Sequence, residues 1–561
     1  MELTPSSLES MTIEHRIRHA AKIEISRRKM LGILGSSAAG AVSLSSVTGL
    51  LSACGAATTP SVVRDTLTIL IPASVRQVNA LDSDIQVYTV CALGMESLLQ
   101  FDNDFKLAPS LAESWSQPDP VTYVYSLRPN VKFWDGSVMT PDDVVYCINL
   151  MVSDPTSGWG FLYANFESIT ATGPMEVTIK TKVPDAIFKY VAAMGSMRVW
   201  SKAFGEKQPV AQLGSPQVLN MGTGPYKFTA LEPDQGVTLE RNDLYWGKKP
   251  VYKTITCSIV TDEATRELAM RSGSVDGAWS VPLTSVPQWE QIPNTKVYFA
   301  PGATAVFWAF NMDKEPFNDI HARKAFCHCV DRTGLVKALL HGHGAIALGL
   351  EPPEAFGDVL NQPGATAFYS SLPQLEFDIN AARQELALSK YPNGFSTSIN
   401  YPDFLGYVGL MMQNVSQNLA QIGVHLQVNQ IPVDLWNAQL HASVRPEQLL
   451  MYYFQQDYPD PVEMPSYFCA SQYAEPTPGG ENWANYRNPA LDALLVQQAT
   501  ATGSERTTII EQICALIARD VPYFAVWWEQ NAFALNSTRF KMINQNWLLG
   551  YQMWADKIVP L

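Results

Sequence analysis

The chain has 561 residues, of which 47% are hydrophobic and 16% are charged. This composition predicts a folded core, excludes a disordered chain and leaves room for several domain-sized units. The net charge is −14, and six basic and four acidic residues precede Cys54, so the rest of the chain has a net charge of −16. Nucleic-acid binding needs a basic surface, so we expect no nucleic-acid partner for this acidic body.

The first 53 residues are predicted to be an export signal. Arg27, Arg28 and Lys29 precede an uncharged run over residues 30–51, and the segment ends Leu51-Ser52-Ala53-Cys54. A basic start, an apolar middle and small residues before the cleavage point are typical of such signals. The start resembles a twin-arginine signal, and the end resembles the lipobox of bacterial lipoproteins, which implies lipidation of Cys54. Residues 54–64 are small and polar, as expected of a flexible tether.

A plain transmembrane anchor is the alternative for the same segment, because the uncharged run is long enough to span a bilayer. The run is rich in Gly, Ser and Ala and only mildly apolar, which disfavours a stable span. Both interpretations place the body of the protein outside the cytoplasm.

The segment from residue 66 to residue 151 alternates predicted strands and helices. Thr66–Ile71 is β-rich and predicts a buried strand, residues 87–100 predict a helix, and residues 123–128 alternate like a strand. A second helix is expected to begin at Thr140-Pro141-Asp142-Asp143, where Thr140 can cap the helix and Pro141 suits its first position. Val144, Ile148 and Met151 then fall on one face of it.

The segment from Met221 to Trp279 predicts two short strands, a helix and a return to a sheet. Residues 226–229 and 237–240 alternate as strands around a turn at residues 233–236. Glu263–Ser272 predicts a helix with Gly273 as its stop. Further on, residues 417–422, Gly423 and residues 424–428 predict a helix, a stop and a strand, and residues 505–519 and 523–529 predict an amphipathic helix and a strand.

Several blocks of these segments resemble one family. They are L-A-E-S-W, L-R-x-x-V-K-F-x-D-G and T-x-D-D-V between residues 111 and 144, then G-T-G-P-Y-K-F, L-E-R-N-x-x-Y-W-G and R-S-G-x-V-D between residues 222 and 276. In this order they resemble the extracytoplasmic solute-binding proteins of family 5, which serve peptide and nickel ABC importers. The resemblance implies an α/β, two-lobed periplasmic-binding-protein-like fold (class II, or cluster C) with an extra inserted domain in the first lobe.

The same resemblance implies an organisation along the chain. The export signal occupies residues 1–53 and the tether residues 54–64. The first lobe would comprise residues 65–104, 221–300 and 509–561, the inserted domain residues 105–220, and the second lobe residues 301–508. Strands that cross between the lobes would permit hinge closure.

The implied function is capture without chemistry. A monomer, anchored by its lipid to the outer face of the cell membrane or held in the periplasm, would close on a peptide or other small solute and deliver it to an ABC transporter permease. Nickel complexes, oligosaccharides and opines compete with peptides as the solute. A secreted lipoprotein hydrolase is the alternative from another class, and a sensor or chaperone-like binder without a transporter is a third.

A search for catalytic and metal-binding patterns favours the binding interpretation. The sequence has no G-x-S-x-G, H-E-x-x-H or G-x-x-x-x-G-K-[ST] motif, so no catalytic residue, metal or cofactor is predicted. His341 and His343 in a Gly-rich stretch are expected to form a surface turn. Cys327 and Cys329 lack a second Cys pair for a metal site, and most of the seven cysteines after Cys54 are expected to be buried free thiols.

The candidate ligand-binding residues follow an apolar strand at residues 451–455. The pattern D-Y-x-D-P begins at Asp457, and the resemblance implies that this carboxylate pairs with the α-ammonium group of a peptide, whereas a turn-capping aspartate is the alternative. Asp460 is expected to be the turn residue. Phe454 and Trp436 could line the cleft or simply pack in the core. Residues 399–407 contain no Arg, although dipeptide-binding members use one there for the ligand carboxylate, which puts strict dipeptide capture in doubt.

Overall fold

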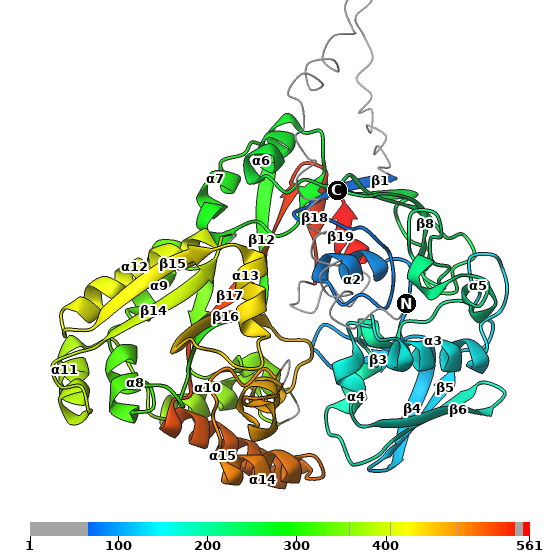
Figure 1. Cartoon of the computed structure of the whole chain (residues 1–561). Helices are drawn as coiled ribbons and strands as arrows, with labels where there is room; N and C mark the ends of the chain where they lie inside the picture. Colours follow the sequence, from blue (N-terminus) through cyan, green and yellow to red (C-terminus); the bar gives the residue numbers. More distant parts are fainter. Residues whose placement is uncertain (1–64, 358, 404, 478–479, 545–553) are drawn as a thin grey trace, which may run out of the picture. The chain divides into compact units, whose positions relative to one another are not determined.

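The computed structural model describes residues 65–357, 359–403, 405–477, 480–544 and 554–561. The predicted export signal, the tether and Cys54 lie outside the described residues. Among the described helices, none combines the length and the apolar character that a membrane span requires. Figure 1 labels the helices and strands discussed below.

A nine-stranded sheet collects strands from distant parts of the chain. Its order is β16-β12-β17-β11-β1-β10-β9-β8, and β13 pairs with β17 outside this path. β1 (Thr66–Ile71) is parallel to β10, whereas β12 and β17 are antiparallel. The other bounds are β8 (Tyr226–Glu232), β9 (Gly236–Arg241), β10 (Thr254–Ile259), β11 (Gly277–Ala278), β12 (Thr295–Phe310), β13 (Gly344–Ile346), β16 (Leu449–Gln455) and β17 (Tyr523–Asn536).

The two long strands β12 and β17 each pack into both apolar cores of the described residues. β12 contributes Tyr298 and Ala300 to one core and Ala305–Phe310 to the other. β17 likewise contributes Phe533 and Leu535 to the first core and residues 523–528 to the second. Their pairing shifts register between Ala300 and Thr304, between the two cores. A continuous pair of strands therefore joins the two cores.

A separate four-stranded sheet follows in the segment predicted to be inserted. Its order is β4-β5-β7-β6, and α3 (Pro141–Ser153) lies against it (Figure 1). The predicted start of α3 is confirmed, because the Asp143 carboxylate accepts hydrogen bonds from both N and Oγ1 of Thr140 at 2.8 Å. The buried face predicted for this helix is also confirmed. The strand bounds are β4 (Ala112–Asp119), β5 (Thr122–Leu127), β6 (Phe166–Gly173) and β7 (Glu176–Thr181).

The helix predicted over residues 87–100 is wrong in its length. Helix α2 (Ile85–Cys91) ends early, and β2 (Leu99–Phe101) begins within the predicted range. Gly224 N donates to the Gly94 carbonyl at 2.9 Å, and Tyr226 N donates to the Leu93 carbonyl at 3.1 Å. These carbonyls bond to the returning chain instead of continuing the helical ladder, a long-range contact that local patterns do not report.

The remaining predicted elements form, several of them with longer bounds than predicted. α6 (Glu263–Ser272) ends at Gly273, whose φ of 69° is left-handed, as predicted for a helix stop. α12 (Gly406–Ala420) begins well before the expected residue 417, and it packs on the parallel pair β14 (Ser396–Pro402) and β15 (His425–Ile431). α15 (Gly503–Asp520) precedes β17 as expected.

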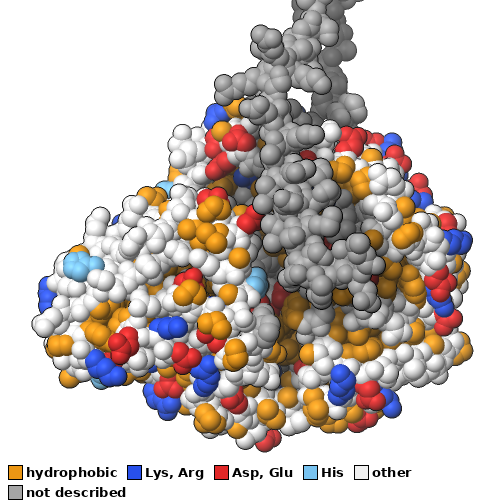
Figure 2. Space-filling view, viewed as in Figure 1, with side chains coloured by type: hydrophobic (Ala, Val, Ile, Leu, Met, Phe, Trp, Pro, Cys, Tyr) orange, Lys and Arg blue, Asp and Glu red, His pale blue; other side chains and the backbone are white. Residues whose placement is uncertain are grey.

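The other elements complete the description. The helices are α4 (Phe188–Val191), α5 (Lys202–Gly205), α7 (Val286–Glu290), α8 (Ile320–Cys327), α9 (Arg332–Leu339), α10 (Gln362–Ser371), α11 (Ile379–Leu388), α13 (Val433–Leu440) and α14 (Pro489–Gln498). The strands are β3 (Leu107–Pro109), β18 (Phe540–Met542) and β19 (Ile558–Pro560). All seven described cysteines are buried, as expected. Basic and acidic side chains alternate over the face shown in Figure 2.

Candidate ligand-binding site

Asp457 lies just beyond the end of β16, which is the first strand in the order of the nine-stranded sheet (β16 is labelled in Figure 1). β16 pairs with β12, and Gln455 is opposite Thr304 at the end of the ladder. The Asp457 backbone N donates to Oε1 of Glu463 at 2.9 Å, and the residue is half-buried. The strand therefore delivers this carboxylate to the edge of the sheet, at a position fixed by a hydrogen bond across the following loop.

Asp460 occupies the turn that was predicted for it. Its carboxylate accepts from Val462 N at 3.2 Å and makes two hydrogen bonds to Nη2 of Arg506, at 2.8 and 2.9 Å. The Asp460 side chain is 1% exposed and that of Arg506 is 10% exposed. This buried ion pair ties the loop after β16 to helix α15.

Two buried carboxyl groups hold the same loop from inside. Glu351 Oε1 accepts from Met464 N at 2.5 Å, and Glu351 Oε2 accepts from the side-chain amide of Gln456. Burial raises the pKa of both Glu351 and Glu463 well above the usual range, and the charge of Asp457 raises that of Glu463 further. Both ends of residues 456–464 are therefore fastened to buried acids, which leaves Asp457 on a well-supported loop.

The surroundings of Asp457 are acidic. Burial, and next the charge of Asp457, raises the pKa of Glu481 to about 7, against the opposite effect of Arg445. Arg445 is buried and donates to the carbonyls of Leu440 and Asn482 at 3.2 and 3.4 Å, and to that of Gly480. Its guanidinium therefore holds the backbone on both sides of residue 481 by hydrogen bonds. A cationic group arriving beside Asp457 would lower the electrostatic repulsion among these carboxyls.

Trp436 and Phe454 both lie in an aromatic cluster. The Trp436 side chain on α13 is buried and stacks on Tyr452 and Tyr453, with centroids 5.6 and 6.1 Å apart. Half-buried Phe454 meets Phe468 edge-on at 5.1 Å and Tyr467 at 6.3 Å. Both rings therefore stabilise the wall that carries Asp457, and their contact with a ligand stays a prediction.

The segment without an arginine faces Glu529, a half-buried carboxyl group. Tyr407 Oη and Trp527 Nε1 donate to Oε1 of Glu529 at 2.8 and 2.9 Å, and burial raises the pKa of Glu529. Glu529 is paired with Thr304, which is also the partner of Gln455, so Glu529 stands two strands, roughly 10 Å, from Gln455. The side of the site next to residues 399–407 therefore contains an acidic group, Glu529, and residues 399–407 themselves supply no arginine.

A small cavity of about 50 Å³ is lined by residues of β16, β17 and α2. Gln455 lines it, opposite Ile85 and Gln86 on α2, and Trp279 and Ser280 close it from the strand β11 side. The α2 cap Asp84 accepts from Gln86 N at 2.9 Å, and burial raises its pKa. The end of β16 is thus the point where elements of both apolar cores meet.

The other chemical candidates have structural roles. His341 has a left-handed φ of 51° in a turn, and its Nε2 donates to the Thr284 carbonyl at 3.1 Å, while the His343 ring stacks on Phe299 at 3.8 Å. The surface-turn prediction is confirmed. Within the described residues, no group of three His, Cys, Asp or Glu side chains is arranged to hold a metal ion.

The sequence missed Glu351, Glu463, Glu481 and Arg506. Arg506 follows its partner Asp460 by 46 residues, and Glu351 precedes the loop by more than 100 residues. No local spacing marks such pairs. Glu463 lies six residues after Asp457 in the same loop, and an acidic residue that close to a predicted ligand carboxylate was the one available signal.

Similarity to known proteins identifies the class of this protein. The family of bacterial extracellular solute-binding proteins, family 5 Middle, matches residues 106–475, about two thirds of the chain, and the chain belongs to this family. The resemblance inferred from the motifs is therefore confirmed. The oligopeptide-binding protein AppA of Bacillus subtilis is 25% identical over 460 residues, which cover 78% of this chain and 81% of AppA.

Solved structures share the fold. The periplasmic binding protein DppA from Helicobacter pylori, in complex with peptide STSA, is 21% identical with a TM-score of 0.73, and the match covers 88% of this chain and 98% of DppA. NikZ from Campylobacter jejuni, in complex with Ni(L-His), is 19% identical with a TM-score of 0.71, covering 86% and 96%. The predicted fold class, two α/β lobes with an extra domain, is confirmed.

Proposed function

We propose that this chain captures a peptide-like solute without chemical turnover and delivers it to an ABC importer, with Asp457 binding the α-ammonium group of the ligand. The observation that carries the proposal is the half-buried Asp457 carboxylate at the end of an edge strand, surrounded by the further acids Glu463 and Glu481. An ammonium group placed there gains a charge-assisted hydrogen bond, worth roughly 1.5–3 kcal/mol.

Strand β16 offers a second recognition element. It is paired with β12 and stands at the end of the strand order. An edge strand can pair with an extended peptide through backbone hydrogen bonds, while pockets beside it take the side chains. The peptide bound to Helicobacter pylori DppA supports this solute class.

A non-peptide solute is the second candidate. It is favoured by residues 399–407, which contain no Arg, and by the half-buried acid Glu529 on that side of the site. A ligand carboxylate would find no cation from that segment, so a strict dipeptide is disfavoured. NikZ, with its bound Ni(L-His), shows that a protein of similar fold takes a metal complex.

The remaining parts of the proposal concern organisation and anchoring. Residues 65–104, 221–300 and 509–561 would form the first lobe, with residues 105–220 inserted and residues 301–508 as the second lobe. The adjacent positions of β1, β10, β9 and β8 in the strand order support the grouping of residues 65–104 with residues 221–300. The protein would act as a monomer held at the outer face of the cell membrane by a lipid on Cys54.

The decisive experiment is calorimetric binding of a matched peptide pair, such as tetra-alanine with a free and with an acetylated N-terminus. We expect acetylation to weaken binding to the wild type at least tenfold, and the Asp457→Asn variant to bind both peptides equally weakly. Asp434→Asn, on helix α13, is the control and should behave as the wild type. An equal affinity of the wild type for both peptides would remove Asp457 from the proposed role. Peptide cleavage during incubation, detected by mass spectrometry, would instead favour the hydrolase.

The anchor is tested in cells. Cys54→Ser should release the protein from the membrane fraction into the soluble fraction, measured by immunoblotting after fractionation. Cys91→Ser, at a buried thiol, is the control and should stay with the membrane. A Cys54→Ser protein that remains in the membrane fraction would rule out the lipid anchor.

A further inference from the structure

A cavity of about 550 Å³ lies beside the loop that carries Asp457. One wall comes from the predicted inserted domain, including Phe161 in the 3-10 helix Gly160–Tyr163, Val183 and Ile187. The opposite wall comes from Tyr458, Tyr467 and helix α14. A volume of this size is typical of cavities that bind small molecules.

The cavity exposes large apolar side chains on both walls. Phe161 is 49% exposed, Val183 is 48% exposed and Val496 on α14 is 73% exposed, and all three line it. Exposed apolar side chains that converge on one concavity indicate a binding surface, whereas single ones scattered on a surface do not.

Asp185 and Gln498, two polar side chains of the lining, already have partners. The Asp185 carboxylate accepts from Asn165 Nδ2 at 3.0 Å and from Ile187 N at 3.1 Å. The Gln498 side chain accepts from Arg506 and donates to the Leu495 carbonyl at 3.2 Å. The cavity therefore suits an apolar occupant, which makes no demand on these polar groups.

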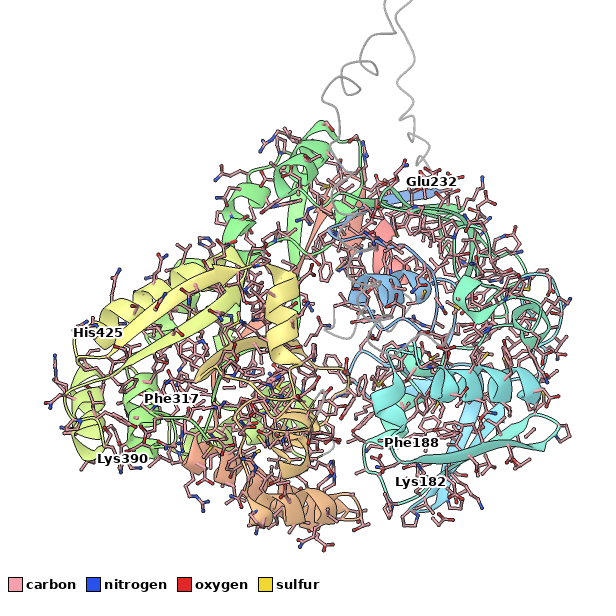
Figure 3. The ribbon with its side chains drawn as sticks, in the orientation of Figure 1. Lys182, Phe188, Glu232, Phe317, Lys390 and His425 are labelled. Carbon is pink, nitrogen blue, oxygen red and sulfur yellow. The ribbon has the colours of Figure 1, made fainter. Side chains whose placement is uncertain are left out.

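The walls are supported from behind. Phe188, labelled in Figure 3, is the first residue of α4 and packs on Tyr123 and Tyr163, with centroids 5.2 and 6.3 Å apart. Lys182, also labelled there, immediately precedes Val183. Tyr190, also on α4, stacks on Tyr458 of the opposite wall at 5.7 Å with an interplanar angle of 11°. The cavity is thus bounded by packed aromatic rings.

A chain of aromatic contacts joins the cavity to the candidate site. Phe454, at the end of β16, contacts Tyr467 at 6.3 Å, and Tyr467 meets Phe161 edge-on at 5.9 Å. The charge of Asp457 reaches Tyr467, whose pKa is raised well above its usual range first by burial and then by the charges of Glu463 and Asp457. Tyr458, another lining residue, directly follows Asp457. The cavity lining therefore begins one residue from the proposed anchor, and the successive residues of an extended peptide, each advancing about 3.4 Å, are the ones to test in it.

We infer that this cavity is a specificity subsite that takes a bulky apolar side chain, aromatic or branched, from the second to fourth position of a peptide whose N-terminus lies at Asp457. The inference rests on the proposed function and deepens it. It assigns the predicted inserted domain a direct part in choosing the ligand.

The test is a calorimetric scan of tetra-alanine and three variants of it with Phe at position two, three or four. We expect one of the three peptides to bind the wild type at least tenfold more tightly than tetra-alanine, which is about 1.4 kcal/mol or more. The gain should disappear in Phe161→Ala and in Val496→Glu. Both side chains are substantially exposed, so the variants are expected to fold, and thermal unfolding would verify this.

Matched controls lie on exposed apolar residues away from the cavity. Phe377→Ala and Leu268→Glu, at positions 43% and 65% exposed, should retain the full gain. If tetra-alanine binds but no Phe peptide binds more tightly, or if the gain persists in Val496→Glu, the subsite is wrong while the proposed function stands. If neither tetra-alanine nor any Phe peptide binds, the proposed function fails and the subsite fails with it.

Discussion

The buried pair of Asp460 and Arg506 offers the sharpest test of how the loop carrying Asp457 is held. In Arg506→Met, the Asp460 carboxylate would keep its hydrogen bond from Val462 N but lose both bonds to Arg506, at 2.8 and 2.9 Å. Its side chain is only 1% exposed, so it has little contact with water that could replace these bonds. Removing one partner of a buried pair costs about 3–5 kcal/mol, because the other charge is left uncompensated.

Urea unfolding measures this cost. The slope of the free energy against urea exceeds about 3 kcal/mol per molar for large chains, so the midpoint should fall by roughly 1 M. Lys253→Met removes an exposed ion pair with Asp65, 2.7 Å long, and is the control. Exposed pairs contribute about 1 kcal/mol or less, so its midpoint should barely move.

A double variant separates charge from packing. Asp460→Leu combined with Arg506→Met removes both charges, and buried pairs replaced by apolar side chains often regain their stability. We expect the double variant to be more stable than Arg506→Met alone. If Arg506→Met unfolds within about 0.5 kcal/mol of the wild type, or if the double variant is no better than the single one, the ion pair does not hold the loop.

Two further predictions concern pH and packing. The folded state raises the pKa of Glu481 from 4.5 to about 7 through burial and the charge of Asp457, so it holds a proton that the unfolded state has released. The free energy of unfolding should therefore fall as the pH rises through this window. Urea titrations at about pH 5 and 7.5 would measure the fall, which should be smaller in Glu481→Gln. An equal fall in the variant would contradict the raised pKa of Glu481. At Gly224, a Cβ atom would stand 2.6 Å from the Gly94 carbonyl, so Gly224→Ala should lose about 1–3 kcal/mol. Gly160→Ala, with no atom within 4 Å of its Cβ, should lose far less, and equal losses would refute the packing argument.

The sequence predicted the features that depend on neighbours within a few residues. The cap at Thr140 and Asp143 and the stop at Gly273 are interactions inside one turn, so spacing alone reveals them. The end of α2 was mispredicted because the carbonyl of Gly94 bonds to Gly224, 130 residues later. Hydrophobic periodicity contains no information on such a competitor for the helical hydrogen bond.

In the candidate site, too, the sequence predicted local features and missed contacts between distant segments. The D-Y-x-D-P pattern located the turn at Asp460, and it marked Asp457 in the same short loop as a candidate whose ligand contact stays a prediction. The stacking of Trp436 on Tyr452 and Tyr453 depends on how α13 packs against β16, so the sequence left ligand contact and core packing equally open. Arg506, which pairs with Asp460, and the buried Glu351 belong to distant segments of the chain, so no local sequence pattern predicts their contacts with the loop.

The loop at residues 456–464 unites the two ligand contacts proposed above. Asp457 and Tyr458 are consecutive residues, one beside the acids and the other lining the apolar cavity. Because Glu351, Glu463 and Arg506 all hold this loop, the positions of the two groups are fixed together before a ligand arrives. Preorganisation of this kind lowers the entropic cost of ordering groups on binding. Arg506→Met should loosen the loop. It should therefore weaken the ammonium contact and also reduce the affinity gained from an apolar side chain. Val496→Glu should reduce only the gain from the apolar side chain. If Arg506→Met weakened the ammonium contact but left the gain from an apolar side chain unchanged, the loop would not connect the two contacts.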